Sequence, residues 1–478
     1  MTDRNTPTTR LDSRWIVPGL LAVILAAALL LRIRYATLNE WPTVDGVNYL
    51  DQARQLLTTG RMSFSCFPPG WPLLIALPLI FLDPGDPLEL FRAAQAANVV
   101  CGALLPLLAY LALKPFLGRW WSLAGSAVLA FLPQNIILSK GDLSEMSFTC
   151  GLLGSWLLYR RRSWLAAGLL FGFTYLIRPE AVLAAAGLLL HETLRERRIP
   201  WRMVVGLAVP ILPYLVYVRV AGGAWGLSSK DVALSQSLQA HPGWSYLGLI
   251  AANSAKLAPM LPGLLGLPLV ILAVVGLVTG RGRWLWMMAP FLPVPFIINP
   301  MVVRFWQPYL PFLLLAAGLG AGWIVRRSGG RRWVGAAVAV IALGSLGIAN
   351  RDDARWVRPN TEAYYGLRDA GLWLRDRVDQ ETIIAAYKPY TSYWGGCRFI
   401  KIPDEESADL IVTWARNHGA EYIIANVLVT HTLAPGLDPL LQQPLPDRLA
   451  RRLTLVKLFD YDIVNHNTAV YRIEDPIR

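Results

Sequence analysis

A series of long apolar stretches constrains this chain more than any other feature of its sequence. A helix that crosses a bilayer needs about 20 predominantly apolar residues. Mean hydropathy is +0.41 and only 16% of the residues are charged, against about 25% in a typical soluble domain. The pattern predicts a polytopic α-helical membrane protein with about eleven spans. The expected spans are 15–34, 89–113, 120–138, 146–159, 163–177, 180–192, 203–221, 260–279, 284–300, 305–325 and 333–349.

The distribution of charge predicts how these spans are oriented. The formal net charge is +13. With a cytoplasmic N-terminus and one crossing per span, the inner loops receive 18 basic and 4 acidic residues. This asymmetry follows the positive-inside rule, so the basic excess requires no nucleic-acid partner. We expect a multi-pass protein of an inner (plasma) membrane whose C-terminal part is extracytoplasmic.

The stretch from 163 to 191 holds Arg178-Pro179-Glu180 near its middle. A single kinked span is conceivable, because membrane helices tolerate proline. It would, however, carry the basic loop 195–198 to the outer side and disturb the charge asymmetry of the later loops. We therefore expect two short helices that meet at Arg178-Pro179-Glu180 on the outer face.

The composition changes at Arg351, which predicts two domains. Residues 1–350 form the expected transmembrane catalytic module, with an outer loop at 35–88. Residues 351–478 contain 16 basic and 18 acidic residues and form the expected soluble, extracytoplasmic α/β domain. Hydrophobic periodicity predicts its elements. They are helices at 361–378 and 406–418 and strands at 383–387, 398–402, 421–427, 454–459 and 468–473.

Charged residues gather in the loops of one side rather than inside the spans. A transporter would place ionisable groups near the midplane, often within repeated halves. Carboxylates beside cations at headgroup depth suit chemistry on a lipid-borne phosphate, with the carboxylate as general base and the cations on the phosphate. A non-enzymatic lipid or polysaccharide transporter, or a flippase-like protein, is the alternative. The residues in question are Asp45, Lys140, Asp142, Glu145, Arg178, Glu180 and Arg304.

Several motifs follow one another along the loops of this side. Asp45 and Tyr49 open the first loop, and a Pro-Pro-Gly-Trp-Pro run follows at 68–72. Further on come the acids of the second loop, the Arg178 turn and the stretch 304–311 at the start of a late span. In this order the motifs resemble the membrane glycosyltransferases of the GT-C fold. That class includes dolichyl-phosphate-mannose protein mannosyltransferases and the bacterial aminoarabinose transferases that act on lipid A.

The resemblance implies an enzyme of the cell envelope that moves a sugar from a lipid carrier. The donor would be a polyprenyl-phosphate sugar of undecaprenyl or dolichyl type. The acceptor would be a hydroxyl of a lipid, glycan or protein on the extracytoplasmic side. Transfer usually proceeds with inversion at the anomeric carbon. A related GT-C enzyme that uses a polyprenyl diphosphate donor, or that transfers a preassembled oligosaccharide, is a further alternative.

The same resemblance implies roles for individual residues. Asp45 would be the catalytic base. Many relatives carry Asp-Glu here, whereas this chain has Asp45-Gly46, so the second acidic role passes to Asp142 or Glu145 or is absent. Some GT-C enzymes use a divalent cation and others do not, and the sequence leaves this open. The implied substrate-binding residues are Tyr49, Lys140, Arg178, Glu180 and Arg304.

Each of these residues also has a purely structural interpretation. Asp45 and Asp142 could cap the helices that follow them. Glu145 could be a solvated residue of the loop rim. Arg178 and Arg304 could extend toward lipid headgroups. The run 68–72 reads as a rigid scaffold.

Cysteine and histidine point to no metal site. Cys101 and Cys150 fall in apolar segments, where we expect them to pack. A disulfide between Cys66 and Cys397 is left open, because spacing alone does not establish one. The five histidines are dispersed, and the sequence holds no His/Cys cluster that would predict zinc.

Overall fold

A computed structural model describes most of the chain, and it divides into two compact units. The helical unit comprises Met1–Leu38, Gln55–Pro78 and Ala93–Arg358. The sheet unit comprises Asn39–Arg54, Leu79–Arg92 and Pro359–Arg478. The predicted domain division at Arg351 stays a prediction. The described residues are 13–62, 67–223, 226, 248, 251, 253–255, 259–279, 303–352, 365–405, 407–461 and 467–474.

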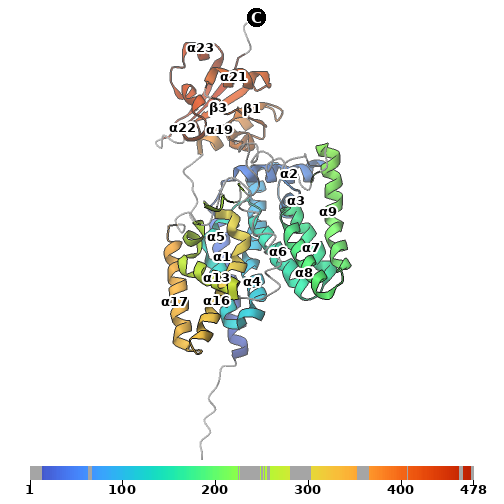
Figure 1. The fold of residues 1–478 in the computed structure, drawn as a ribbon. Helices are drawn as coiled ribbons and strands as arrows, with labels where there is room; N and C mark the ends of the chain where they lie inside the picture. The colour runs from blue at the N-terminus through green and yellow to red at the C-terminus, as the bar shows by residue number, and fades with distance from the viewer. Residues whose placement is uncertain are drawn as a thin grey trace, which may run out of the picture. The chain divides into compact units, whose positions relative to one another are not determined.

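Helices dominate the first part of the chain (Figure 1). Those of the second apolar half are α12, α13, α16 and α17, with a 3₁₀ helix, η1, before α16. The bounds are α1 (Ser13–Thr37), α2 (Val44–Thr59), α3 (Gly70–Leu79), α4 (Pro87–Phe131), α5 (Pro133–Ser139), α6 (Glu145–Arg160), α7 (Trp164–Ile177), α8 (Ala181–Glu196), α9 (Trp201–Gly222), α12 (Met260–Leu265), α13 (Leu267–Thr279), η1 (Val303–Tyr309), α16 (Leu310–Arg327) and α17 (Arg332–Ala349).

Four stretches among the described residues are long and apolar enough to cross a membrane. They are Trp15–Thr37, Pro87–Phe131, Trp201–Gly222 and Arg304–Arg327. A fifth results if Asn253–Leu265 and Leu267–Thr279, which are bent by 111°, count as one broken span. The chain is thus a multi-pass helical membrane protein. The expected total of about eleven spans is not confirmed.

Glycines explain where the helices depart from the expected spans. The two spans predicted at 89–113 and 120–138 lie largely within α4, which breaks at Gly118 (φ 74°, ψ 175°). The span predicted at 260–279 is divided into α12 and α13 at Gly266 (φ 79°). Both conformations are accessible to glycine because it has no Cβ. The span expected at 284–300 lies outside the described residues.

Small residues let the helices of this unit pack closely. A Cβ added to Gly168 of α7 would lie 2.2 Å from the carbonyl oxygen of Met203 in α9. A Cβ on Gly276 of α13 would lie 1.8 Å from the carbonyl oxygen of Ala316 in α16. Close backbone approach at small residues is a general way of joining helices in membranes. Figure 1 shows α6, α7 and α9 together in one group.

The described residues of the sheet unit form a five-stranded sheet of order β2-β1-β3-β5-β4. β1, β2 and β3 are parallel, whereas β5 runs antiparallel to both β3 and β4. The five strands and two main helices predicted from periodicity are confirmed, and shorter elements come in addition. The bounds are β1 (Ile383–Ala386), β2 (Arg398–Lys401), β3 (Tyr422–Asn426), β4 (Leu453–Phe459), β5 (Thr468–Ile473), α19 (Tyr365–Arg375), α20 (Tyr390–Gly395), α21 (Ala408–Asn417), α22 (Val427–Leu433), η2 (Pro435–Leu441) and α23 (Asp447–Ala450).

Part of the first polar loop packs within the sheet unit. The Trp41 ring lies 5.1 Å from the Tyr390 ring and 6.4 Å from the Trp394 ring. Arg368 Nη1 lies 3.3 Å from Glu40 Oε2. These aromatic and ionic contacts join residues more than 300 positions apart, and sequence periodicity had not predicted them.

Candidate active site

Two arginines and two glutamates from three separate segments form a cluster in the helical unit. Arg178 Nη1 lies 3.0 Å from Glu145 Oε1, and Arg178 Nη2 lies 3.6 Å from Glu180 Oε1. Arg304 Nε lies 3.6 Å from the same Oε1 atom of Glu145. Glu145 therefore holds both arginines. We call these four residues the Glu–Arg cluster.

Local structure explains how the cluster is assembled. Glu145 is the first residue of α6, and Arg304 belongs to η1. Arg178 ends α7 in an extended conformation, with Pro179 and Glu180 leading into α8. Because the residue before a proline avoids the helical region, the turn at Arg178 is encoded locally. The predicted meeting of two short helices at this turn is confirmed.

The cluster is buried, which excludes two of the structural interpretations. The Glu145 side chain is 3% exposed and that of Arg178 is 10% exposed. Glu145 is thus no solvated rim residue, and Arg178 does not extend toward headgroups. The Phe148 and Phe305 rings lie 5.6 Å and 5.8 Å from the Arg178 guanidinium carbon. A charge buried among rings needs its carboxylate partners, so the cluster is a mutually dependent set.

Two buried polar groups near the cluster lack hydrogen-bond partners in the part of the chain that the structure describes. Oε2 of Glu145 accepts no hydrogen bond, whereas Oε1 contacts both arginines. Gln307, three residues after Arg304, is fully buried with neither amide atom bonded. Buried polar groups are normally satisfied, and each exception calls for an explanation, of which a catalytic role is one. Sequence analysis had not singled out Gln307, although it lies within the 304–311 motif.

The loop before α6 is fastened through its backbone carbonyls. Gln95 of α4 donates from Nε2 to the carbonyl oxygen of Lys140 at 2.7 Å. Asn98, one turn further, donates from Nδ2 to the carbonyl oxygens of Gly141 and Leu143 at 2.9 and 2.8 Å. These amide side chains hold the loop in one conformation. The positions of the side chains that this loop carries are thereby fixed as well.

The Pro-Pro-Gly-Trp-Pro run supports the same loop from another direction. The Trp71 indole is fully buried and donates from Nε1 to the carbonyl oxygen of Asp142 at 2.7 Å. A Cβ on Gly70 would lie 2.5 Å from the backbone carbon of Leu176 and 2.6 Å from the backbone nitrogen of Ile177. The run thus touches both the Asp142 loop and the end of α7 that precedes Arg178. These contacts fit the interpretation of residues 68–72 as a scaffold.

Lys140 and Asp142 are both buried in this loop. Burial lowers the pKa of Lys140 to about 8, because the charged ammonium is disfavoured away from water. Asp142 is fully buried. The residue that precedes α6 is Ser144, so the interpretation of Asp142 as a helix cap is wrong.

A buried arginine, which sequence analysis had also missed, anchors the neighbouring end of α5. Arg32 of α1 is fully buried. It donates from Nε to Ser139 Oγ at 3.1 Å and from Nη1 to the carbonyl oxygens of Ala28 and Ala130 at 3.0 Å each. A Cβ on Gly102 would lie 2.5 Å from Arg32 Nε. Because Gly102 has no side chain, there is room for the Arg32 guanidinium. A charged residue within an apolar segment is the sequence feature that could have identified Arg32.

Asp45 and Tyr49 belong to the sheet unit, on α2. Thr43 Oγ1 accepts the backbone N–H of Gly46 at 2.9 Å, so Thr43 caps α2. The interpretation of Asp45 as the cap is wrong, since it lies inside the first turn. Asp45 is half-buried and Tyr49 is buried.

Lys388, a further residue missed by sequence analysis, lies within electrostatic range of Asp45. Burial lowers the pKa of Lys388, the nearby Lys401 lowers it further, and Asp45 acts in the opposite direction. Both Asp45 and Lys388 lie in the sheet unit. The carboxylate of Asp45 thus has a cationic neighbour that neither motif nor spacing had indicated.

The described residues contain no group of three or more His, Cys, Asp or Glu side chains placed to hold a metal ion. The Glu–Arg cluster offers two carboxylates that already bind arginines. Cys66 of the open disulfide question lies outside the described residues.

Comparison with solved structures identifies the fold. No protein-family model and no curated protein matches the sequence. The oligosaccharyltransferase of Archaeoglobus fulgidus in complex with zinc and sulfate is similar with a TM-score of 0.60 and 13% identity, over 93% of this chain and 72% of that one. The same enzyme, AglB, with an inhibitory peptide and a dolichol-phosphate gives 0.57 and 12%, over 86% and 69%.

A bacterial structure matches over nearly the whole of both chains. It is ArnT from Cupriavidus metallidurans bound to undecaprenyl phosphate, with a TM-score of 0.59 and 13% identity over 95% of this chain and 98% of ArnT. These neighbours are GT-C membrane glycosyltransferases. At such identity the likeness concerns the fold, and the chain has the GT-C fold that its motifs had predicted.

Proposed function

We propose that this chain is a glycosyltransferase that moves a sugar from a polyprenyl-phosphate donor to a hydroxyl acceptor at the extracytoplasmic face of an inner membrane. The observation that carries the proposal is the position of Arg178 between Glu145 and Glu180, with Arg304 on the same Glu145 oxygen. Such buried, carboxylate-oriented guanidinium groups suit a phosphate leaving group. The GT-C fold supports this, since ArnT was solved with undecaprenyl phosphate and AglB with dolichol-phosphate.

In the proposed reaction Asp45 is the general base. The acceptor hydroxyl oxygen attacks the anomeric carbon as Asp45 takes its proton. The bond between that carbon and the phosphate oxygen breaks, and the electron pair leaves with the phosphate. Arg304 is the more exposed arginine of the cluster, with 23% of its side chain accessible. We assign both Arg304 and Arg178 to the departing phosphate, with Lys140 as an additional cation. Arg178 also orients Glu145 through their ion pair.

The remaining predicted residues receive supporting roles. Asp142 or Glu145 supplies the second acidic group that Gly46 does not provide. Because Glu145 already contacts two arginines, Asp142 is the better choice for it. Tyr49 and Glu180 contact substrate. The proposal also includes about eleven spans and a cytoplasmic N-terminus. The C-terminal domain is extracytoplasmic and helps to select the acceptor.

The test compares Asp45→Asn with Asp51→Asn, a substitution on the same helix. Asp51 pairs with Arg54 and is 39% exposed. Membranes that contain each variant are incubated with the polyprenyl-phosphate sugars and lipid extract of the source cells, and the glycosylated product is quantified by mass spectrometry. We expect Asp45→Asn to lower the rate about 10²–10⁴-fold while binding of undecaprenyl phosphate persists. Asp51→Asn should behave like the wild type. If Asp45→Asn turns over substrate at the wild-type rate, Asp45 is not the general base. Lipid transport without any glycosylated product would favour the alternative of a transporter.

A further inference from the structure

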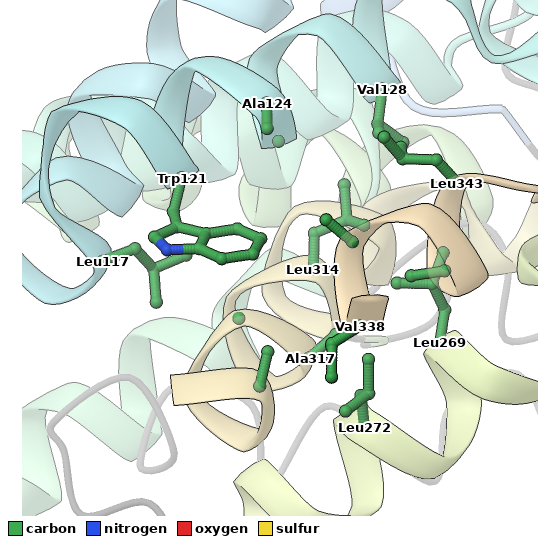
Figure 2. A pocket seen from close by; sticks show the side chains of 15 residues that line it. Leu117, Trp121, Ala124, Val128, Leu269, Leu272, Leu314, Ala317, Val338 and Leu343 are labelled. Atoms are coloured by element: carbon green, nitrogen blue, oxygen red, sulfur yellow. The ribbon is translucent and has the colours of Figure 1, made fainter. Parts of the chain in front are cut away.

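An apolar cavity lies among α4, α13, α16 and α17 of the helical unit (Figure 2). Its volume is about 90 Å³. Trp121 of α4 reaches toward it from one side, and Leu272 of α13, Leu314 of α16 and Val338 of α17 border it from the others. Its lining residues are aliphatic apart from Trp121 and two glycines. A cavity of this chemistry excludes water.

The cavity has a buried floor and an accessible rim. Leu272 and Leu314 are each 7% exposed, whereas Trp121 is 41% and Leu343 is 51% exposed. The lining helices are apolar, and α4 and α16 belong to stretches that qualify as membrane spans. A rim on such apolar helices suits contact with bilayer hydrocarbon. A hydrocarbon chain that enters from the bilayer can fill the space without desolvating any polar group.

Basic residues without acidic neighbours in the sequence lie at one end of this cavity. Lys114 precedes the lining residue Leu117 by three positions, and Arg326 follows the lining residue Ala321 by five, which is about 7.5 Å along a helix. Segments 105–138 and 305–350 contain no Asp or Glu at all. Arg119, Arg327 and Arg331 are further basic residues of these segments.

A second basic group of the helical unit, at the turns that follow α6 and α8, differs in this respect. There Arg162 and Arg195 each lie 3.7 Å from Glu196. A cytoplasmic excess of basic residues accounts for both ends equally. Among the described residues, the segments that line the cavity combine basic residues that have no Asp or Glu nearby in the sequence with a space for a hydrocarbon chain.

We propose that this cavity and its cationic end form a binding site for an anionic bilayer phospholipid. One acyl chain occupies the cavity, and the headgroup phosphate contacts Lys114 and Arg326. The Trp121 ring covers the chain near the interface, where indole rings are favoured. The site is separate from the Glu–Arg cluster and does not depend on the proposed sugar transfer.

The first experiment tests the cavity. Full-length protein is delipidated in detergent and titrated with dioleoyl phosphatidylglycerol, and bound lipid is counted by native mass spectrometry. Ala339→Leu fills the cavity from α17, whereas Ala337→Leu places the same side chain on the exposed face of α17 outside the lining. We expect Ala339→Leu to weaken binding of one lipid about tenfold and Ala337→Leu to leave it unchanged. Ala124→Leu, which fills the cavity from α4, serves where Ala339→Leu does not fold. Equal binding by filled and control variants overturns the proposal.

The second experiment tests the headgroup and the chain type. Lys114→Gln combined with Arg326→Gln should abolish the preference for phosphatidylglycerol over phosphatidylcholine, and Arg198→Gln at the other basic end should retain it. Undecaprenyl phosphate is then added to the lipid-loaded protein. Persistence of the bound phosphatidylglycerol supports the acyl-chain site. Its one-for-one displacement would show that the cavity takes an isoprenoid chain, which overturns the assignment.

Discussion

Arg178 Nη1 lies 3.0 Å from Glu145 Oε1, and both side chains are almost completely buried. The two residues stand at the ends of different helices, 33 positions apart. A buried ion pair is weak evidence of net stability, because desolvation offsets much of the attraction. Its removal on one side is nevertheless severe, since a buried charge is then left without compensation. This relationship makes Glu145 the most informative residue of the cluster.

Glu145→Ala should lower the free energy of unfolding by about 3–5 kcal/mol, because it leaves Arg178 as an uncompensated buried charge. Unfolding in detergent micelles, followed by intrinsic tryptophan fluorescence, provides the measurement. Glu196→Ala is the matched control. Its carboxylate pairs with two arginines but is 46% exposed, so a loss of at most about 1 kcal/mol is expected. A similar decrease in the free energy of unfolding for the two variants would show that the buried pair with Arg178 matters no more than the exposed pairs of Glu196.

Trp71→Phe should lower stability by about 1–3 kcal/mol, because the carbonyl oxygen of Asp142 loses a buried hydrogen bond. Activity should fall as well, since that loop carries Asp142 and precedes Glu145. Trp156→Phe is a close control, because Trp156 is equally buried and its indole N–H makes no hydrogen bond among the described residues. Both variants lose the same ring volume. If Trp156→Phe proves as harmful as Trp71→Phe, ring packing rather than the hydrogen bond explains the effect.

Gly70→Ala should distort the end of α7, because the new Cβ would meet the backbone of Leu176 and Ile177. Backbone atoms cannot move aside as a flexible side chain can, and overpacking of this kind typically destabilises by about 1–3 kcal/mol. We expect a lowered melting temperature together with reduced sugar transfer, since Arg178 follows directly. Gly19→Ala places the same methyl in open space on α1 and should be harmless. Wild-type activity for Gly70→Ala would disprove the scaffold assignment.

The burial of Lys140 predicts a pH dependence of donor binding. Its pKa is about 8 in the folded protein against 10.5 for the free side chain, so the ammonium loses its proton as the pH rises through about 8. The KM for the donor should therefore increase above pH 8 in the wild type. Lys140→Arg should stay flat to pH 9, because the guanidinium remains charged. A parallel increase in both proteins would assign the effect to another group.

The same group predicts a trend of opposite sign for stability. A lysine whose folded pKa is lowered binds fewer protons in the folded than in the unfolded chain between pH 8 and 10.5. The free energy of unfolding then rises with pH across this window. Lys140→Met should remove this contribution, which chemical unfolding at several pH values would measure.

Hydropathy, charge asymmetry and strand periodicity were sufficient to predict the helical membrane class, the turn at Arg178 and all five strands of the sheet. These properties are local, because an apolar stretch or a period-2 alternation reports which surface a single element will bury. The motifs at Asp45, Glu145, Arg178 and Arg304 were also readable as residues. The contacts that these residues make could not be predicted from the sequence. Thr43 rather than Asp45 caps α2, and only the folded geometry shows that Glu145 is buried and holds two arginines.

What the sequence by itself determined is the helical membrane class, the turn at Arg178, the strands of the sheet and the chemical types of the loop residues. The tertiary structure decided which of those groups meet. Gln95, Asn98 and Trp71 hold a loop some 40 to 70 positions away through hydrogen bonds to its backbone. These bonds go to carbonyl oxygens, so the side chains of the loop do not predict them. Contacts of this kind depend on how helices pack at glycines and prolines. The physical reason is that packing selects one set of long-range pairs from many that local periodicity permits equally.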